Sequence, residues 1–210
     1  MSAEPLLACT ACPRLASHLA GVRRRYPGYY TRPVLPFGAA PARLLIVGLA
    51  PGLHGANRSG RPFTGDHAGI LLYATLHRYG FADQSQSRAA DDGLRLIDCR
   101  ITNAVKCLPP QNKPLPAEVR ACNRHLAAEI AALEPVIVLA LGKVAHEAVL
   151  MALGERLCAH RFAHGARHRL SALTLFDSYH CSRYNTQTRR LTPEAFAAVF
   201  AAIRDELDGR

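Results

Sequence analysis

The sequence contains no apolar run that approaches the roughly 20 residues of a transmembrane helix. Its first residues also lack the basic segment and long apolar stretch of a secretory signal peptide. The protein is therefore expected to be cytoplasmic, with no membrane partner. It also lacks internal repeats and long low-complexity tracts, and its 210 residues are enough for a sizeable core. A single domain over 1–210 is expected.

Acidic residues are scarce. The chain has 16 Asp and Glu against 26 Lys and Arg, which gives a formal net charge of +10. Such an excess favours an acidic polymer as partner, usually nucleic acid and less often a membrane surface. The alternative is a genome that simply favours Arg and Ala. Nothing in the sequence indicates an oligomer, so a monomer is expected.

Short apolar runs alternate with segments of helical periodicity. Four runs read as buried strands, at 43–50, 96–105, 135–142 and 172–180. Helical patterns cover 14–27, 68–79, 117–133, 143–153 and 193–207. Strands that alternate with helices predict an α/β fold with a four-stranded, mostly parallel sheet.

Three unusual loops follow the first, second and fourth of these strands. They read GLAPGLHGANRSGRPFTGD (48–66), TNAVKCLPP (102–110) and SYHCSRYNT (178–186). Parallel α/β sheets bind ligands beyond the carboxyl ends of their strands. The three loops therefore predict one functional site at that edge of the sheet.

The first loop excludes two common ligands. No Gly-Lys-Ser/Thr follows as in a P-loop, and glycines at 48, 52, 55 and 60 do not match a dinucleotide fingerprint. A flat base suits the loop better, with Phe63 stacking on it and Arg58 and Arg61 holding a phosphate. The alternatives are that Phe63 anchors the loop in the core and that Asp66 is a helix N-cap.

Seven cysteines in a cytoplasmic chain point to metal binding or catalysis rather than disulfides. Two pairs suit a four-thiolate site: Cys9 with Cys12, and Cys107 with Cys122. Zinc and a [4Fe–4S] cluster both remain open. The wide spacing of the second pair leans towards iron–sulfur. The alternative is that all four thiols are small buried apolar residues.

The three loops and the four cysteines together resemble the type-5 uracil-DNA glycosylases, the iron–sulfur branch of the uracil-DNA glycosylase superfamily often called type B. The resemblance runs from Cys9 to about Thr192. It implies a three-layer α/β/α domain with four parallel strands. It implies hydrolysis of the N-glycosidic bond of uracil, hypoxanthine or xanthine in DNA. It also implies a structural [4Fe–4S] cluster, held by the four cysteines.

The resemblance assigns roles in the base pocket. Phe63 would stack on the flipped base, Asn103 would read its Watson–Crick edge, and His180 would stabilise negative charge on it. Gly48 and Ala50 would complete the base site.

The group that activates water is less obvious. Related branches carry Asp, Asn or Glu at the position of Ala50. Asp66 is therefore the expected catalytic carboxylate, with Asn57 as the fallback. An apolar Ala50 should also leave room in the pocket and broaden the range of bases.

The third loop departs from the family's His-Pro-Ser, because it reads His180-Cys181-Ser182. Without proline the loop loses a backbone constraint, which puts the efficiency of base flipping in doubt, and it gains a thiol that could be oxidised. Arg183 and Tyr184 would form the wedge that enters the minor groove. The other DNA contacts expected are Arg58, Arg61, Ser182, Arg189 and Arg190.

Two other functions compete. A uracil-restricted, type-4-like glycosylase predicts a polar residue at position 50, and Ala50 counts against it. A non-catalytic iron–sulfur or zinc module that binds DNA or senses damage would need only the basic charge and four thiolates.

Overall fold

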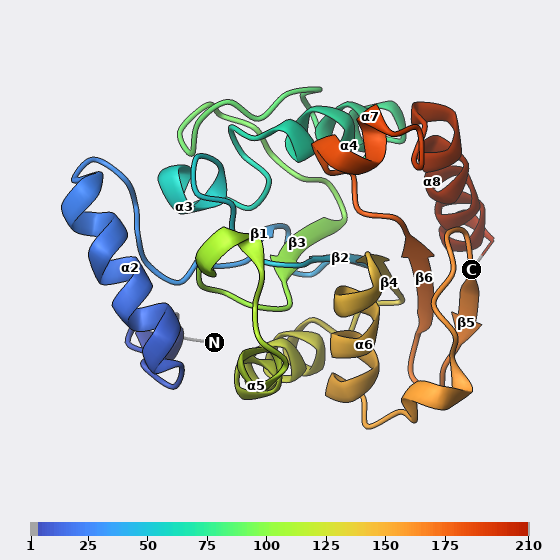
Figure 1. Cartoon of the computed structure of the whole chain (residues 1–210). Coiled ribbons are helices and arrows are strands. Elements are labelled where there is room, and N and C mark those ends of the chain that lie inside the picture. The colour runs from blue at the N-terminus through green and yellow to red at the C-terminus, as the bar shows by residue number, and fades with distance from the viewer. Residues whose placement is uncertain (1–3, 210) are drawn as a thin grey trace.

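The computed structural model describes residues 4–209, and its centre is one six-stranded sheet in the order β1-β3-β2-β4-β6-β5 (Figure 1). The four inner strands are β3 (Cys99–Asn103), β2 (Leu44–Gly48), β4 (Ile137–Leu141) and β6 (Thr174–Ser178). All three pairings among them are parallel. The predicted α/β class with a mostly parallel sheet is confirmed.

The predicted number of strands is wrong, because two short strands extend the sheet. β1 (Phe37–Gly38) and β5 (Arg167–Arg169) pair antiparallel with β3 and β6 at the two edges. Neither strand contains an apolar run or alternating apolar and polar residues, because an edge strand buries few side chains. The second predicted strand, 96–105, is also longer than the observed β3.

The inner strands are almost entirely buried because helices cover both faces of the sheet. Every residue of β2, β4 and β6 is buried. On one face lie α4 (His67–Arg78) and α8 (Pro193–Asp208), and on the other lie α5 (Pro116–Leu133) and α6 (Lys143–Ala152) (Figure 1). This is the expected three-layer arrangement.

The N-terminal part packs beside the second helical layer. α1 (Glu4–Leu7) leads to α2 (Pro13–Arg25), where Arg14 forms a bidentate pair with Glu118 of α5, both contacts at 2.7 Å. Glu118 also accepts the N–H of Leu115, which satisfies a free donor at the start of α5. The pair fixes the segment of Cys9 and Cys12 against α5.

Short helices occur within segments expected to be irregular. They are α3 (Ala56–Ser59), the 3₁₀ turns η1 (Pro110–Asn112) and η2 (Leu157–Ala159), and α7 (Arg183–Gln187). The expectation of an unbroken loop after His180 is therefore wrong, since Ser182 caps α7 by accepting the N–H of Asn185.

None of the described helices is long and apolar enough to cross a membrane. The single domain over 1–210 remains a prediction, and its ends, residues 1–3 and 210, lie outside the described residues.

Candidate active site and thiol cluster

The first, second and third loops of the sequence analysis meet beyond the carboxyl ends of β2, β3 and β6. They enclose a cavity of about 390 Å³, within the range of small-molecule sites. Its lining combines an aromatic ring, an amide, an imidazole and a carboxylate, from Phe63, Asn103, His180 and Asp66. The remaining lining residues are Leu49, Ala50, Gly52, Ala56, His67, Ala68, Asn112, Ser182 and Arg183.

Gly48 and Asn103 are partners at the ends of β2 and β3. A Cβ on residue 48 would lie 2.5 Å from Oδ1 of Asn103 and 2.6 Å from Cζ of Phe63. Glycine is therefore required here by the close approach of two pocket side chains. Gly48 supports the predicted base site through its lack of a side chain.

Phe63 is buried, and its ring lies against that of His180, with centroids 5.8 Å apart and planes inclined by 28°. Its backbone is left-handed, with φ of 55°, which is uncommon for a residue other than glycine. The ring anchors its loop in the core, as the alternative expected, and it also lines the cavity, while stacking on a base remains a prediction.

His180 follows β6 and is partly exposed to the cavity. Burial lowers the pKa of its imidazole to about 4, so the ring is neutral at pH 7. Its backbone carbonyl accepts a hydrogen bond from Nδ2 of Asn185 at 2.8 Å, which holds the loop from α7. A neutral imidazole can donate to an oxygen that becomes negative.

Asp66 is an N-cap, as the alternative reading expected, and it also lines the cavity. It is the N-cap of α4, where Oδ1 accepts the N–H of Gly69 at 3.0 Å. Oδ2 lies against Gly55, where any Cβ would collide with the carboxylate. Burial raises the pKa of Asp66 although the cap hydrogen bonds oppose that shift. Asp66 is also the one carboxylate among the described residues that line this cavity.

Asn57, the fallback for water activation, does not line the cavity. It lies in α3 and is fully buried, and its amide finds no hydrogen-bond partner among the described residues. Ala50 does line the cavity, with no polar atom on its side chain. The geometry thus favours Asp66 over Asn57.

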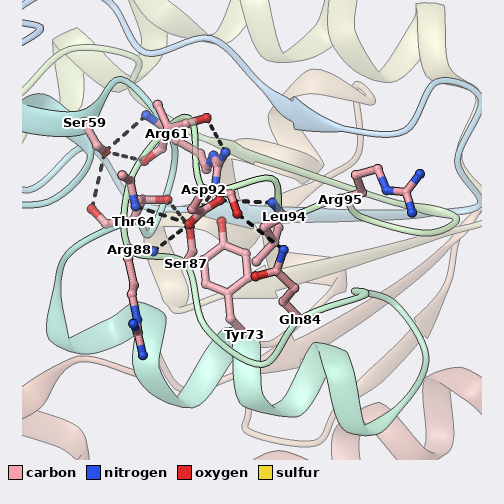
Figure 2. Close-up of polar contacts among 12 residues, drawn as sticks. Ser59, Arg61, Thr64, Tyr73, Gln84, Ser87, Arg88, Asp92, Leu94 and Arg95 are labelled. Atoms are coloured by element: carbon pink, nitrogen blue, oxygen red, sulfur yellow. Dashed lines mark hydrogen bonds and ion pairs between the residues drawn. The ribbon is translucent and has the colours of Figure 1, made fainter.

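Arg61 does not lie where the sequence analysis expected it, because its side chain is buried beneath the first loop (Figure 2). Nη1 contacts Oδ1 of Asp92 at 2.6 Å and Oγ of Ser87 at 3.1 Å, and Nη2 donates to the carbonyl of Ala90. The guanidinium also covers the ring of Phe37 at 4.4 Å. The prediction that Arg61 contacts a phosphate is therefore wrong, because the buried carboxylate of Asp92 neutralises its charge.

The same polar network supports the backbone on both sides of Phe63. The hydroxyl of Tyr73 donates to the carbonyl of Pro62 at 2.8 Å. The hydroxyl of Thr64 lies 2.7 Å from that of Ser87 (Figure 2). Because these contacts hold the residues on both sides, they stabilise the uncommon left-handed conformation of Phe63.

The predicted wedge lies on α7, next to α4 (Figure 1). Tyr184 is 70% exposed, and Arg183 is exposed at the rim of the cavity. The other arginines predicted to contact phosphates, apart from Arg61, are also exposed, namely Arg58, Arg189 and Arg190. The guanidinium of Arg190 lies 4.4 Å from the centre of the Tyr179 ring.

Cys181, which replaces the family's proline, is fully buried in the core beneath the loop. Burial raises the pKa of its thiol far above the usual range. A buried protonated thiol is a poor oxidation site, so this suggested role does not fit the structure. Packing of Cys181 and the bond from Asn185 to His180 restrain the loop without proline.

Sequence reasoning missed two polar residues of the cavity, Asn112 and His67. Asn112 has φ of 57° at the end of η1, in the proline-rich segment after β3. Because this segment follows a strand end, its polar residues could have been predicted to lie near the cavity. His67 begins α4 and contacts Oγ1 of Thr186 in α7 at 2.9 Å, which no local pattern could indicate.

The four predicted metal ligands gather at a second place. Cys9, Cys12, Cys107 and Cys122 line one cavity of about 460 Å³ between α2, α5 and the segment after β3. Burial and then the neighbouring thiols raise the pKa of Cys107 to about 12. Two N–H groups point at the sulfurs, from Lys106 to Cys122 and from Arg124 to Cys9, both at 3.4 Å. The site offers soft sulfur ligands with hydrogen-bond donors, which suits a metal or cluster.

Comparison with known proteins agrees with this geometry. The family model of the uracil DNA glycosylase superfamily matches residues 35–204. A type-5 uracil-DNA glycosylase of Thermus thermophilus is 48% identical over 93% of this chain and 92% of its own length. A type-5 uracil-DNA glycosylase of Pyrobaculum aerophilum is 42% identical over 92% of this chain and 87% of its own length. A type-4 enzyme of Thermotoga maritima is 35% identical over 68% and 60%. The chain therefore belongs to the uracil-DNA glycosylase superfamily and, within it, to the type-5 enzymes.

Proposed function

We propose that this DNA-repair glycosylase hydrolyses the N-glycosidic bond of uracil after turning the nucleotide out of the duplex, and that it also accepts hypoxanthine and xanthine. The observation that carries the proposal is the joint presence of Phe63, Asn103, His180 and Asp66 around one cavity. A base outside the stack could enter a cavity of about 390 Å³.

In the proposed mechanism the base is held by its face and its edge. Phe63 stacks on it, and the carboxamide of Asn103 donates to and accepts from its polar edge. Asn103 ends β3 and Gly48 ends β2, so both are fixed by the sheet. A rigid strand end is a good support for recognition of a small planar ligand.

Bond cleavage leaves negative charge on the base. The C1′–N bond breaks, its electron pair stays on the base nitrogen, and the sugar gains positive charge. The neutral His180 ring donates a hydrogen bond to the base oxygen where that charge collects. A ring that is neutral at pH 7 still carries one N–H, so His180 can donate this hydrogen bond without first gaining a proton.

Water completes the reaction from the other side of the sugar. Asp66 accepts a proton from the water whose oxygen forms the new bond to C1′. Before that step, the same carboxylate stabilises the positive sugar by its charge. The anionic base takes up a proton when it leaves. The raised pKa of Asp66 makes it a better proton acceptor than an exposed carboxylate.

Apolar Ala50 supports the wider base range. A polar side chain at this position would form a fixed hydrogen bond, and bases without a matching group would be rejected. Ala50 contributes no such group to the cavity. Purines such as hypoxanthine should then bind in the cavity almost as well as uracil does.

The proposed DNA surface surrounds α7. Tyr184 is the wedge, Arg183 lies at the rim, and Arg58, Arg189 and Arg190 contact phosphates. Ser182 contributes by capping α7. Arg61 is omitted because Asp92 neutralises it.

We further propose that the four cysteines hold a [4Fe–4S] cluster. All four thiols line one cavity and offer the soft sulfur ligands that such a cluster takes. When bound, the cluster supplies a covalent cross-link between the N-terminal segment and α5. Lys106 and Arg124 donate N–H···S bonds to the thiolates. The reaction itself uses none of these residues.

Single-turnover base release by anaerobically purified protein tests the function. Matched duplexes carry uracil, hypoxanthine, xanthine or cytosine at one position. Release of the first three but not of cytosine supports the whole proposal, and release of uracil alone would overturn the wider range. Tight DNA binding without release of any base would contradict catalysis and favour a DNA-binding module. Tyr184→Ala should slow release most from a matched U·A pair, which is harder to open than U·G.

A further inference from the structure

A second group of potential metal ligands lies away from the pocket and the thiols. It consists of His146 on α6, His168 on β5 and Asp177 on β6. One donor atom from each lies within 4.8 Å of the other two, and among the described residues this is the only such group of three. The established activity gives these residues no role.

The position of Asp177 is unusual for its surroundings. Leu173, directly before β6, and Leu175 precede it on the same side of the sheet and pack into the core beneath α5 and α6. Asp177 occupies the next inward position and is fully buried, and His146 is only 1% exposed. A carboxylate among apolar residues is costly unless a positive charge compensates it.

The hydrogen bonds of His146 indicate that a positive charge is needed between its Nδ1 and Asp177. Nε2 of His146 lies 2.9 Å from the carbonyl oxygen of His160, which can only accept, so Nε2 carries a proton. In the neutral ring, Nδ1 then presents its lone pair to Oδ1 of Asp177 at 2.8 Å. A lone pair and a carboxylate at this distance need a cation between them, either a proton or a metal ion.

We propose that Nδ1 of His146, Nε2 of His168 and the carboxylate of Asp177 bind a divalent transition-metal ion, with Zn²⁺ the best match. Imidazole and carboxylate ligands suit zinc, whereas calcium and magnesium prefer oxygen alone. Nε2 of His168 lies 3.0 Å from Oδ2 of Asp177. Tetrahedral zinc separates such ligand atoms by about 3.4 Å, so each histidine needs to move only slightly away from Asp177 to admit the ion.

Two further features fit a metal site. The bond from His146 to the carbonyl of His160 is the outer contact that commonly orients a metal-binding histidine. His168 is 14% exposed on an edge strand, which leaves a path from solvent. A bound ion would join α6, β5 and β6 beneath the loop that carries His180.

Zinc binding to the cluster-loaded protein tests this site. Equilibrium dialysis with metal analysis should find about one zinc per chain in the wild type and in His77→Ala, a control at an exposed histidine of α4. His168→Ala should reduce that binding at least tenfold. Zinc should raise Tm by several degrees in the wild type and the control but not in His168→Ala.

X-ray absorption of the zinc-loaded wild type gives an answer that does not depend on how a variant folds. The expected shell has nitrogen and oxygen at about 2.0 Å and no sulfur at about 2.3 Å. A sulfur shell would place the ion at the cysteines and overturn the proposal. Zinc binding that is absent, or equal in His168→Ala and the wild type, would also overturn it.

Discussion

Gly48 and Asn103 face one another so closely that a Cβ on residue 48 would lie 2.5 Å from Oδ1 of Asn103. The same Cβ would meet the ring of Phe63, and both neighbouring side chains are buried, so neither can move aside freely. Gly48→Ala should therefore destabilise the protein by about 1–3 kcal/mol. It should also lower the single-turnover rate at least about tenfold, because two base-binding side chains must move. Gly28→Ala, where no atom lies within 4 Å of the new Cβ, is the matched control. Equal behaviour of the two variants would contradict this account.

Asp66 can be separated into its capping and chemical roles. Asn is a good N-cap, so Asp66→Asn should keep the bond from Gly69 and leave Tm nearly unchanged. The rate should fall by roughly 10²–10⁴, as is typical when a general base is lost. Asp66→Ala should lose the rate and about 1 kcal/mol of stability as well. Fluorescence anisotropy should show DNA affinity unchanged in Asp66→Asn. A loss of affinity as large as the loss of rate would mean that Asp66 only holds DNA.

The pH dependence of kcat/KM should reflect a neutral His180. Its pKa is lowered to about 4, so it gains a proton only as pH falls through that value. The pKa of Asp66 is raised above 3.8, and it too loses its active form as pH falls. Activity should decline only on the acid side, with no inflection at about 6.5, the usual pKa of histidine. An inflection there that disappears in His180→Gln would show that the imidazole titrates normally.

The buried pair of Arg61 and Asp92 should matter far more for stability than the exposed pair of Arg95 and Asp83, which lies in the same segment as Asp92. Arg61→Ala leaves a carboxylate with little solvent and should cost about 3–5 kcal/mol of unfolding free energy. Arg95→Ala breaks the pair with Asp83, in which the Arg95 side chain is 83% exposed, and should leave the urea midpoint nearly unchanged. Urea unfolding measures both. Similar costs would contradict the buried role of Arg61.

The pair also predicts acid sensitivity. Hydrogen bonds from Arg61 and three backbone N–H groups lower the pKa of Asp92 to about 2 although burial opposes them. A lowered pKa stabilises the fold above the unfolded value of about 3.9, and this stability is lost as pH falls towards 2. Asp92→Asn should therefore show a smaller drop in urea midpoint between about pH 5 and 3 than the wild type does.

Loss of one ligand should remove the proposed cluster. Cys107→Ala should give colourless protein in low yield, because Cys107 lines the thiol cavity. Cys158→Ser, at an exposed cysteine, should keep colour, yield and activity. Visible absorbance and iron analysis distinguish the variants. Normal iron content in Cys107→Ala would overturn the ligand assignment.

Much of the architecture could be predicted because it depends on local patterns. The apolar runs gave the inner strands, and the helical pattern at 68–79 matches α4 within one residue at each end. The strand ends then located Phe63, Asn103 and His180 around one cavity. β1 and β5 were missed because two or three residues carry no periodicity.

The role of Arg61 could not be read from its motif. An arginine in a glycine-rich loop is equally compatible with a phosphate and with a buried carboxylate. Its partner Asp92 lies 31 residues away in a polar segment without regular pattern. Cys181 is similar, because its burial depends on packing against elements distant in sequence. Sequence therefore located the site better than it assigned the charges around it.

The 2.9 Å contact between His67 and Thr186 has a mechanical consequence. His67 follows Asp66 at the start of α4, and Thr186 lies on α7, two residues after Tyr184. α7 cannot be pushed away from the sheet unless it breaks this bond or pulls the first turn of α4 with it. In the proposed DNA complex, a displacement of α7 would therefore be transmitted through this hydrogen bond to the turn that carries Asp66.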